Sequence, residues 1–466
     1  MAMAEQVQLK KARLVDMILY GFGGIGANIP FIFMGAYLSF FYTDIFGLAP
    51  AIVSALMLGS KIVDAVIDPF IGALADRVVT KFGKFRPFVM FGAPVMGLSI
   101  FMVFSTPDLD PNAKVLYACA AYIFYVIASS FVVIPNNSIA NLMSADPKQR
   151  ATVQTFKQGM AAIPQFMSAM ALPLVDLLGG GTAGWSNYGI VMGIATCVVF
   201  WICTMGSKNY DTYELAREET TGDKSERKSA GDVVRDIAKT FKNKEMLLLI
   251  GAFCTEMTCF TLQNTMNMYY FTYVLGHKDW VATVSSVGVI VGIIGTITVP
   301  FFTRVWGKKR SFQVFVALTI LPNLLMLFVP SPELALITVA MSSYSFTSRI
   351  VIVFAWSMIP DVVDYGEYTT GVRSNGLTQA SVQLMNQLGQ ALGGSIPVMI
   401  IGALGYVANQ AQTPEVLGAI VALRWGVPCV FNLISFIFIR FYGLTDERAA
   451  EIGAKLQERR IEARSE

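Results

Sequence analysis

The sequence is poor in charged residues, which excludes the usual soluble protein classes. Only 14% of its 466 residues are charged, whereas soluble domains carry about a quarter. The single histidine, His277, lies in a short loop, so we expect no metal site or proton relay built on histidine. The six cysteines fall inside apolar blocks and show neither a disulfide framework nor a metal-ligand spacing. A net charge of +3 is too small to indicate a nucleic-acid partner.

Apolar residues, in contrast, come in long blocks. They make up 54% of the chain, and the mean hydropathy is +0.56. Twelve blocks are long enough to cross a hydrocarbon core of about 30 Å at about 1.5 Å per residue. The sequence therefore predicts an all-α polytopic membrane protein with twelve transmembrane helices. The predicted spans are 18–42, 48–75, 87–106, 114–142, 152–178, 188–206, 245–275, 280–302, 311–329, 334–359, 376–406 and 417–442.

The lysines and arginines indicate the orientation. Twenty-eight of the 35 lie in the termini, in the 207–244 stretch and in alternate loops, whereas the six opposite loops, together with the residues at their edges, hold two, Lys114 and Lys278. Because positive loops stay on the cytoplasmic side, both termini and the 207–244 loop are predicted to be cytoplasmic. We expect a multi-pass protein of the plasma membrane, the inner membrane in a bacterium, surrounded by membrane lipid.

The chain divides into two similar halves. The predicted parts are a six-helix bundle at 1–206, a cytoplasmic linker at 207–244, a second bundle at 245–442 and an amphipathic tail at 443–466. Residues 72–86, after the second helix, are echoed in shortened form by residues 304–310, after the eighth. Two pseudo-symmetric six-helix bundles joined by a basic loop are typical of major facilitator transporters, whose substrate site lies at the midplane between the halves.

A pair of carboxylates occupies the second helix. Asp64 and Asp68 are four residues apart, so they share one helical face, and they lie about 20 and 14 Å above the cytoplasmic boundary set at Arg77. Carboxylates at such depth usually mark an ion or substrate path. They can hold a hard cation such as sodium or share a proton. The alternative is a static ion pair of Lys61 with Asp64, which would leave Asp68 unmatched.

Several motifs identify a family. The chain resembles the glycoside–pentoside–hexuronide:cation symporters, the melibiose-permease-like branch of the major facilitator superfamily, along its whole length. The resemblance assigns the cation site to Asp64 and Asp68, assisted by a hydroxyl of the fourth helix at Ser130. It implies symport of a small sugar or glycoside with Na⁺ or H⁺, with no other cofactor or metal. The matching residues are Tyr20–Gly23, Phe41–Asp44, Asp64–Pro69, Gly83–Pro87, Asp361–Tyr368 and Val372–Arg373.

The residues that grip the sugar in melibiose permease are not retained. At the matching positions this chain has Asn28, Val133, Asn137, Gln158 and Leu388. The substrate is therefore not expected to be melibiose. We predict that amide side chains at mid-depth bind it, namely Asn28, Asn137, Gln158 and Gln263, and that Lys157 supplies a displaced positive charge. The alternative is that these amides only tie helices together.

Two further charges are not expected from the resemblance. Glu256 lies twelve residues after Lys244, and Arg349 lies twelve residues before Asp361, so both should be about 18 Å above the cytoplasmic boundary. Arginine keeps its charge and binds carboxylates in two places. Either the two residues form a structural pair, or Arg349 binds the carboxylate or sulfonate of an anionic substrate.

A cluster of charges after the tenth helix is the predicted cytoplasmic gate. It consists of Asp361, Asp364, Glu367 and Arg373. The resemblance implies that these residues lock the cytoplasmic ends of the two halves, although mixed charges facing the cytoplasm could also simply be solvated.

Other functions fit the sequence less well. Transport of lysolipids by the same fold predicts a more apolar cavity, against which the amide set, including Asn264, argues. An enzyme would need a soluble domain or a nucleophile with its base, and a receptor would need a signalling extension. The sequence shows none of these, so we predict a transporter and not an enzyme.

Overall fold

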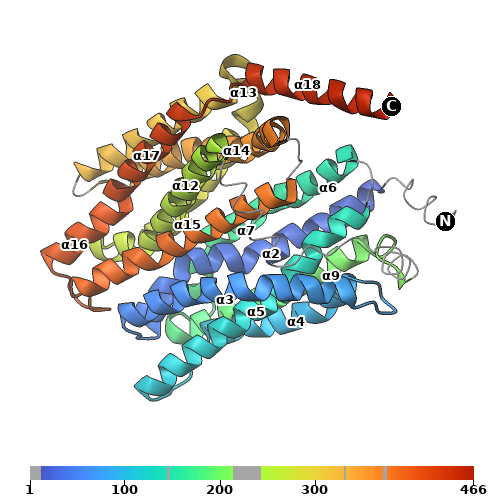
Figure 1. The fold of residues 1–466 in the computed structure, drawn as a ribbon. Coiled ribbons are helices and arrows are strands. Elements are labelled where there is room, and N and C mark those ends of the chain that lie inside the picture. The colour runs from blue at the N-terminus through green and yellow to red at the C-terminus, as the bar shows by residue number, and fades with distance from the viewer. Residues whose placement is uncertain (1–11, 144–146, 214–242, 330–331, 371–374, 466) are drawn as a thin grey trace. The chain divides into compact units, whose positions relative to one another are not determined.

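The computed structural model describes residues 12–143, 147–213, 243–329, 332–370 and 375–465 (Figure 1). Most of the predicted linker, and Arg373 of the predicted gate, lie outside these described residues. The chain forms two compact units, Met1–Ser225 and Glu226–Glu466. In Figure 1 the N-terminal unit runs from blue to green and the C-terminal unit from yellow-green to red.

The N-terminal unit is built from helices alone in its described part. Proline opens several of them, because its fixed φ suits the first helical turn and its missing N–H has no partner there. The elements are α2 (Leu14–Phe40), the π-helical turn η1 (Phe41–Ile45), α3 (Pro50–Arg77), α4 (Arg86–Phe104), α5 (Pro111–Met143), α6 (Pro147–Met160), α7 (Ala162–Ala169), α8 (Ala171–Leu177) and α9 (Gly181–Gly206).

The C-terminal unit is also helical. Its elements are α12 (Lys244–Tyr269), η2 (Tyr270–Val274), α13 (Trp280–Leu327), α14 (Leu334–Thr370), α15 (Asn375–Ala403), α16 (Pro414–Val421), η3 (Ala422–Gly426), α17 (Val427–Phe441) and α18 (Asp446–Ser465). The long α13 is two helices that meet at Gly307, whose φ of 75° breaks the helical path. The tail forms α18, which packs on α14 and has Ile452 and Leu456 buried.

The predicted all-α membrane fold is confirmed. Within the described ranges, nine helices are long and apolar enough to span a bilayer. The predicted spans fall on helical segments, with 152–178 divided among α6, α7 and α8, and with 280–302 and 311–329 on the two parts of α13. The number twelve itself stays a prediction.

Large apolar side chains face outward, as the membrane requires. On α9 one face carries exposed residues every three or four positions, while glycines and Phe200 occupy the opposite, buried face. Such a pattern would be unstable in water and is stable only where hydrocarbon covers it. The exposed residues are Ile190, Val191, Ile194, Val198, Trp201 and Met205.

The first helices of the two units end in the same way. In η1 the N–H of Phe46 donates to the carbonyl of Phe41 at 2.8 Å, and in η2 the N–H of Leu275 donates to that of Tyr270 at 3.0 Å. Glycine with positive φ follows in each case, Gly47 and Gly276. This repeated helix end was not found from the sequence. It supports the view that the two halves are built in the same way.

A carboxylate caps an equivalent helix start in each unit. Asp211 accepts hydrogen bonds from the N–H groups of Lys84, Phe85 and Arg86 at 2.6, 2.7 and 2.6 Å, at the beginning of α4. Asp446 accepts from the N–H of Lys308 at 2.6 Å, where the second part of α13 begins. These helix starts carry free N–H groups and partial positive charge, which a carboxylate satisfies.

The same segments explain two glycines. A Cβ on Gly83 would lie 2.4 Å from the carbonyl oxygen of Asp211, and one on Gly307 would lie 2.2 Å from Oδ2 of Asp446. Both glycines also have positive φ. The neighbouring Tyr210 donates its hydroxyl to Asp16 at 2.8 Å. Burial raises the pKa of Tyr210, which keeps that hydroxyl protonated.

We predict that Asp211→Asn destabilises the N-terminal unit. Loss of a charged helix cap costs about 1–2 kcal/mol, so the midpoint of thermal unfolding in detergent should fall by about 2–6 °C. Asp108→Asn is the matched control, because this exposed carboxylate lies in the loop between α4 and α5. Equal unfolding midpoints for the two variants would contradict the capping role.

Candidate functional site

The two carboxylates of α3 have different partners. Lys61 Nζ lies 3.4 Å from Oδ2 of Asp64, three residues further along the helix. The side chains are 25% and 17% exposed, so the pair is partly screened from solvent. Ser130 of α5 donates its hydroxyl to Oδ1 of Asp68 at 2.7 Å. The static pair considered for Lys61 is therefore present, but Asp68 is not left unmatched.

This arrangement gathers oxygen ligands from two helices. Asp68 keeps further acceptor capacity after binding one hydroxyl, and Asp64 lies one turn before it on the same face. Tyr122 and Tyr125, with rings 6.1 Å apart, precede Ser130 on α5 and lie near Asp64. Hard cations such as sodium prefer carboxylate and hydroxyl oxygens, and a shared proton needs the same groups. The geometry is suited to either ion.

A buried ammonium forms a second cluster in the N-terminal unit. Lys157 of α6 is 8% exposed. It donates to Oδ1 of Asn137 on α5 in a short hydrogen bond, and its Nζ lies 5.6 Å from the centre of the Tyr20 ring. None of its contacts within the described chain is an ion pair with a carboxylate. The structure thus brings together two residues that the sequence assigned to the substrate.

Close packing of α2 on α6 puts Lys157 there. A Cβ on Gly24 would lie only 2.1 Å from the Lys157 carbonyl oxygen, so only glycine allows this approach. A Cβ on Gly21, Gly23 or Gly26 would also lie less than 3.0 Å from a side chain of a neighbouring helix, so this run of glycines serves helix packing. Asn28, one turn further, donates to the Gly24 carbonyl at 2.8 Å. The Gln158 side chain lies outside the described residues, so its predicted role stays a prediction.

Gln263 is tied to its own unit. It is 3% exposed, and its Nε2 donates to Oδ1 of Asn323 on α13 at 2.9 Å. Asn323 in turn donates to the Thr319 carbonyl at 3.0 Å. This bond between helices corresponds to the alternative in which an amide holds helices together. A role in substrate binding stays a prediction for this residue.

Glu256 and Arg349 do not contact each other. Glu256 is 5% exposed, and its Oε1 has no hydrogen-bond partner among the residues that the structure describes. The aliphatic part of the Arg349 side chain packs against Gly292 of α13. A Cβ on Gly292 would lie only 3.1 Å from the Cγ of Arg349. Its guanidinium lies 5.7 Å from the centre of the Phe260 ring. In this structure the two charges are not a pair, although both are predicted at the same depth.

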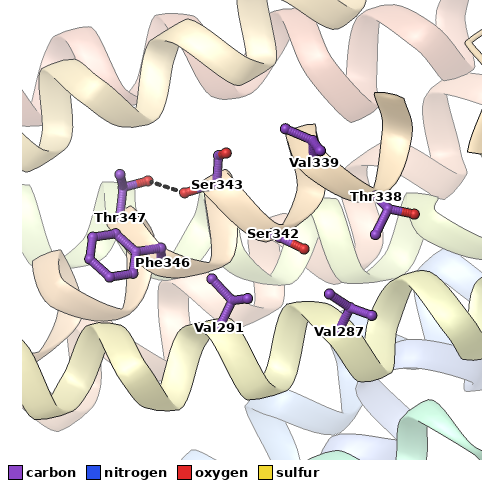
Figure 2. Close-up of a pocket in the computed structure, with 8 residues that line it drawn as sticks. All are labelled: Val287, Val291, Thr338, Val339, Ser342, Ser343, Phe346 and Thr347. Atoms are coloured by element: carbon purple, nitrogen blue, oxygen red, sulfur yellow. Dashed lines mark hydrogen bonds between the residues drawn. The ribbon is translucent and has the colours of Figure 1, made fainter. Parts of the chain in front are cut away.

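An open pocket of about 410 Å³ lies between α13 and α14 (Figure 2). Figure 2 shows valines of α13 facing hydroxyl side chains of α14, with Thr347 donating to the Ser343 carbonyl at 3.1 Å. Arg349 follows Thr347 by two residues on α14 but is not one of the lining residues. The lining residues are Val287, Val291, Thr338, Val339, Ser342, Ser343, Phe346 and Thr347, and none was predicted from sequence.

The predicted gate residues lie at the end of α14. Asp361 binds Lys308 of the same unit, with its two carboxylate oxygens 2.9 and 2.7 Å from Nζ. The Asp361 side chain is 20% exposed, so it is not simply solvated. Asp364 and Glu367 also have interaction partners. A lock between the two halves stays a prediction.

Comparison with known proteins decides the family. The model of the family described as MFS/sugar transport protein matches residues 19–446. The chain belongs to this family. The resemblance to the glycoside–pentoside–hexuronide symporters is confirmed, and the family and its relatives are membrane transporters, not enzymes.

Named relatives cover nearly the whole chain. A glucuronide carrier protein homolog of Escherichia coli is 32% identical over 95% of this chain and 95% of its own length. An isoprimeverose transporter of Lactiplantibacillus pentosus is 29% identical over 91% of this chain and 87% of its own. A crystal structure of a bacterial homolog of the human lysosomal transporter Spinster has a TM-score of 0.61 at 13% identity, covering 92% and 95% of the two chains. The last similarity concerns the fold alone.

One buried charge of this family member was missed by the sequence analysis. Arg424 is 2% exposed within η3, seven residues after the start of the predicted span 417–442. Its depth could have marked it as a candidate, because a charge within a span is functional more often than structural. The count of lysines and arginines that indicated the orientation did not single out Arg424.

We predict that Gln263→Ala destabilises the protein more than Asn264→Ala. The first change leaves Asn323 without its buried partner, at about 1–3 kcal/mol, whereas Asn264 bonds only to the Phe260 carbonyl of its own helix. Thermal unfolding in detergent measures the difference, expected at a few degrees. Equal midpoints together with a raised half-saturating substrate concentration in Gln263→Ala would instead assign Gln263 to the substrate.

Proposed function

We propose that the protein is a secondary transporter of the bacterial inner membrane that couples a cation to the symport of a glycoside or sugar acid. The observation that carries this proposal is the hydrogen bond of Ser130 to Asp68, 2.7 Å long, beside Asp64. It joins α3 and α5 through the groups best suited to a small cation. The names of the relatives, a glucuronide carrier homolog and an isoprimeverose transporter, support a sugar-type substrate.

The substrate is expected to meet Lys157 and Asn137. Asn137 is exposed while Lys157 is buried behind it, so an incoming oxygen can take the place of the Asn137 amide on the ammonium. A carboxylate or sulfonate would make a charge-assisted hydrogen bond there, which is stronger than a bond to a neutral amide. Arg349 offers a second cation in the other unit. These charges favour an acidic sugar over a neutral one.

We predict that Asp64→Asn and Asp68→Asn each abolish accumulation of substrate against a gradient. Each change keeps the side-chain size and removes the charge that a sodium ion or a proton needs. Uptake of labelled sugars and sugar acids by membrane vesicles, with an imposed sodium gradient or an imposed pH gradient, measures this and identifies the ion. Ser130→Ala should only raise the half-saturating cation concentration, since both carboxylates remain.

Asp108→Asn serves as the control in this assay, because this exposed carboxylate lies in a loop between helices. Protein in the membrane is quantified for every variant, so that loss of expression is recognised. If both helix α3 variants still concentrate substrate, the cation site is assigned to the wrong residues. Uptake of lysolipid in place of sugar would support the other transport class.

We predict that Lys157→Gln and Arg349→Gln weaken transport of acidic sugars more than that of neutral sugars. Loss of a hydrogen bond to a charged group costs about 1.5–3 kcal/mol, or roughly 10–100-fold in affinity. The half-saturating concentrations for a hexuronide and for the matching neutral glycoside measure the difference. Lys278→Gln, an exposed loop variant, should leave both unchanged, and Glu256→Gln should retain binding. An equal loss of both substrates would assign the two cations a structural role.

A further inference from the structure

The C-terminal unit buries an arginine without a counter-charge. Arg424 is 2% exposed, and its Nε and Nη1 have no hydrogen-bond partner within the described part of the chain. Its guanidinium carbon lies 4.0 Å from the centre of the Trp425 ring, so the cation stacks on the indole. An arginine keeps its charge in proteins. A buried cation with open donors is costly unless an acceptor satisfies it.

The surrounding elements supply no carboxylate to Arg424. The helices that pack most extensively against η3 are α12, α13, α16 and α17, and Tyr344 of α14 also lies near Arg424. Among these four helices, α13 and α17 contain no acidic residue. The described acidic residues of the other two are Glu245 and Glu256 on α12 and Glu415 on α16. Glu245 is bound to the N–H of Gly443 at 2.6 Å, at the far end of the unit.

The remaining two carboxylates are not paired with Arg424 in the described part of the chain. Glu256 precedes Tyr270 by fourteen residues, about 20 Å along the helix axis, and the ring centre of Tyr270 lies 5.6 Å from that of Trp425. Glu415 lies in the first turn of α16, nine residues before Arg424, and is exposed. Neither forms an ion pair with Arg424 among the described residues.

Two irregular turns meet around the guanidinium. Arg424 and Trp425 belong to the π-helical turn η3, and Tyr270 opens the π-helical turn η2. Such turns are rare and occur frequently at functional sites. Trp425 adds a third buried donor, since its Nε1 also has no acceptor among the described residues. Three buried donor atoms at this position therefore lack an acceptor among the described residues, which suits an anion.

We propose that Arg424 and Trp425 form an enclosed binding site for a small monovalent anion of the halide type. One such anion would neutralise the single positive charge and accept hydrogen bonds from Nε and Nη1. The enclosure of Arg424 favours a monoatomic ion over a sugar acid or a lipid headgroup. Bound between η2 and η3, the anion would join the end of α12 to the start of α17. This proposal is independent of which substrate is transported.

A halide titration of the purified full-length protein in detergent tests the site. Bromide replaces methanesulfonate at constant ionic strength and constant sodium concentration, and the midpoint of thermal unfolding is recorded. The wild-type midpoint should rise with bromide in a saturable way, by about 2 °C or more. Arg424→Gln should abolish this dependence. Arg440→Gln, an exposed arginine in the last turn of α17, should retain it.

Tryptophan fluorescence gives a second measurement that does not depend on folding of the Arg424 variant. Bromide at the guanidinium lies against the Trp425 indole and should quench it, so the wild-type protein should show a saturable component of quenching. Trp425→Phe should remove that component and leave quenching of the other five tryptophans. A wild-type protein with neither a saturable shift of the unfolding midpoint nor saturable quenching overturns the site. The same is true of an undiminished midpoint shift in Arg424→Gln.

Discussion

Burying a charge in hydrocarbon costs several kcal/mol, and the arrangement of this protein follows from where it accepts that cost. In the N-terminal unit each buried charge has a polar neighbour: Lys61 beside Asp64, Ser130 on Asp68, and Asn137 on Lys157. In the C-terminal unit Glu256 and Arg424 keep buried polar atoms without partners among the described residues. The two units therefore have similar helices but differ in how their buried charged groups are compensated.

The parts that repeat between the units are those that hold helices together. The η1 and η2 turns close the first helix of each unit with the same hydrogen bonds, and Asp211 and Asp446 cap equivalent helix starts. Intramembrane charges of the described residues do not repeat in this way: the carboxylate pair lies in α3, the half-buried Arg349 in α14 and the buried Arg424 in η3. Duplicated residues satisfy backbone groups, which every spanning helix requires. Charges found in one unit are thus better candidates for ion and substrate chemistry.

A feature could be predicted from the sequence when the residues that form it lie close together along the chain. Helix length and hydropathy are local, so the all-α membrane fold followed from them directly. The contact of Lys157 with Asn137 joins two helices and was not predicted: the resemblance marked Asn137 and Gln158, and Lys157 was assigned only as a displaced positive charge. Counting residues predicted that Glu256 and Arg349 lie at one depth, but the depth of a residue along a helix does not fix the direction in which its side chain points. Arg349 turns toward Gly292 and Phe260 instead. The caps of Asp211 and Asp446 span more than a hundred residues, and no local pattern signals them.

The charges of the N-terminal unit bear on the nature of the substrate. Lys61 and Lys157 carry two positive charges, and Asp64 and Asp68 carry two negative ones, so the unloaded site is electrically balanced. A cation bound at Asp68 with a neutral sugar would leave one uncompensated positive charge at a depth where such a charge is costly. A cation bound together with an acidic sugar preserves the balance, with Asp68 facing the cation and Lys157 facing the acid group. If the proposed function holds, coupling follows from charge. The cation and the acidic sugar each compensate the charge that would make binding of the other alone unfavourable.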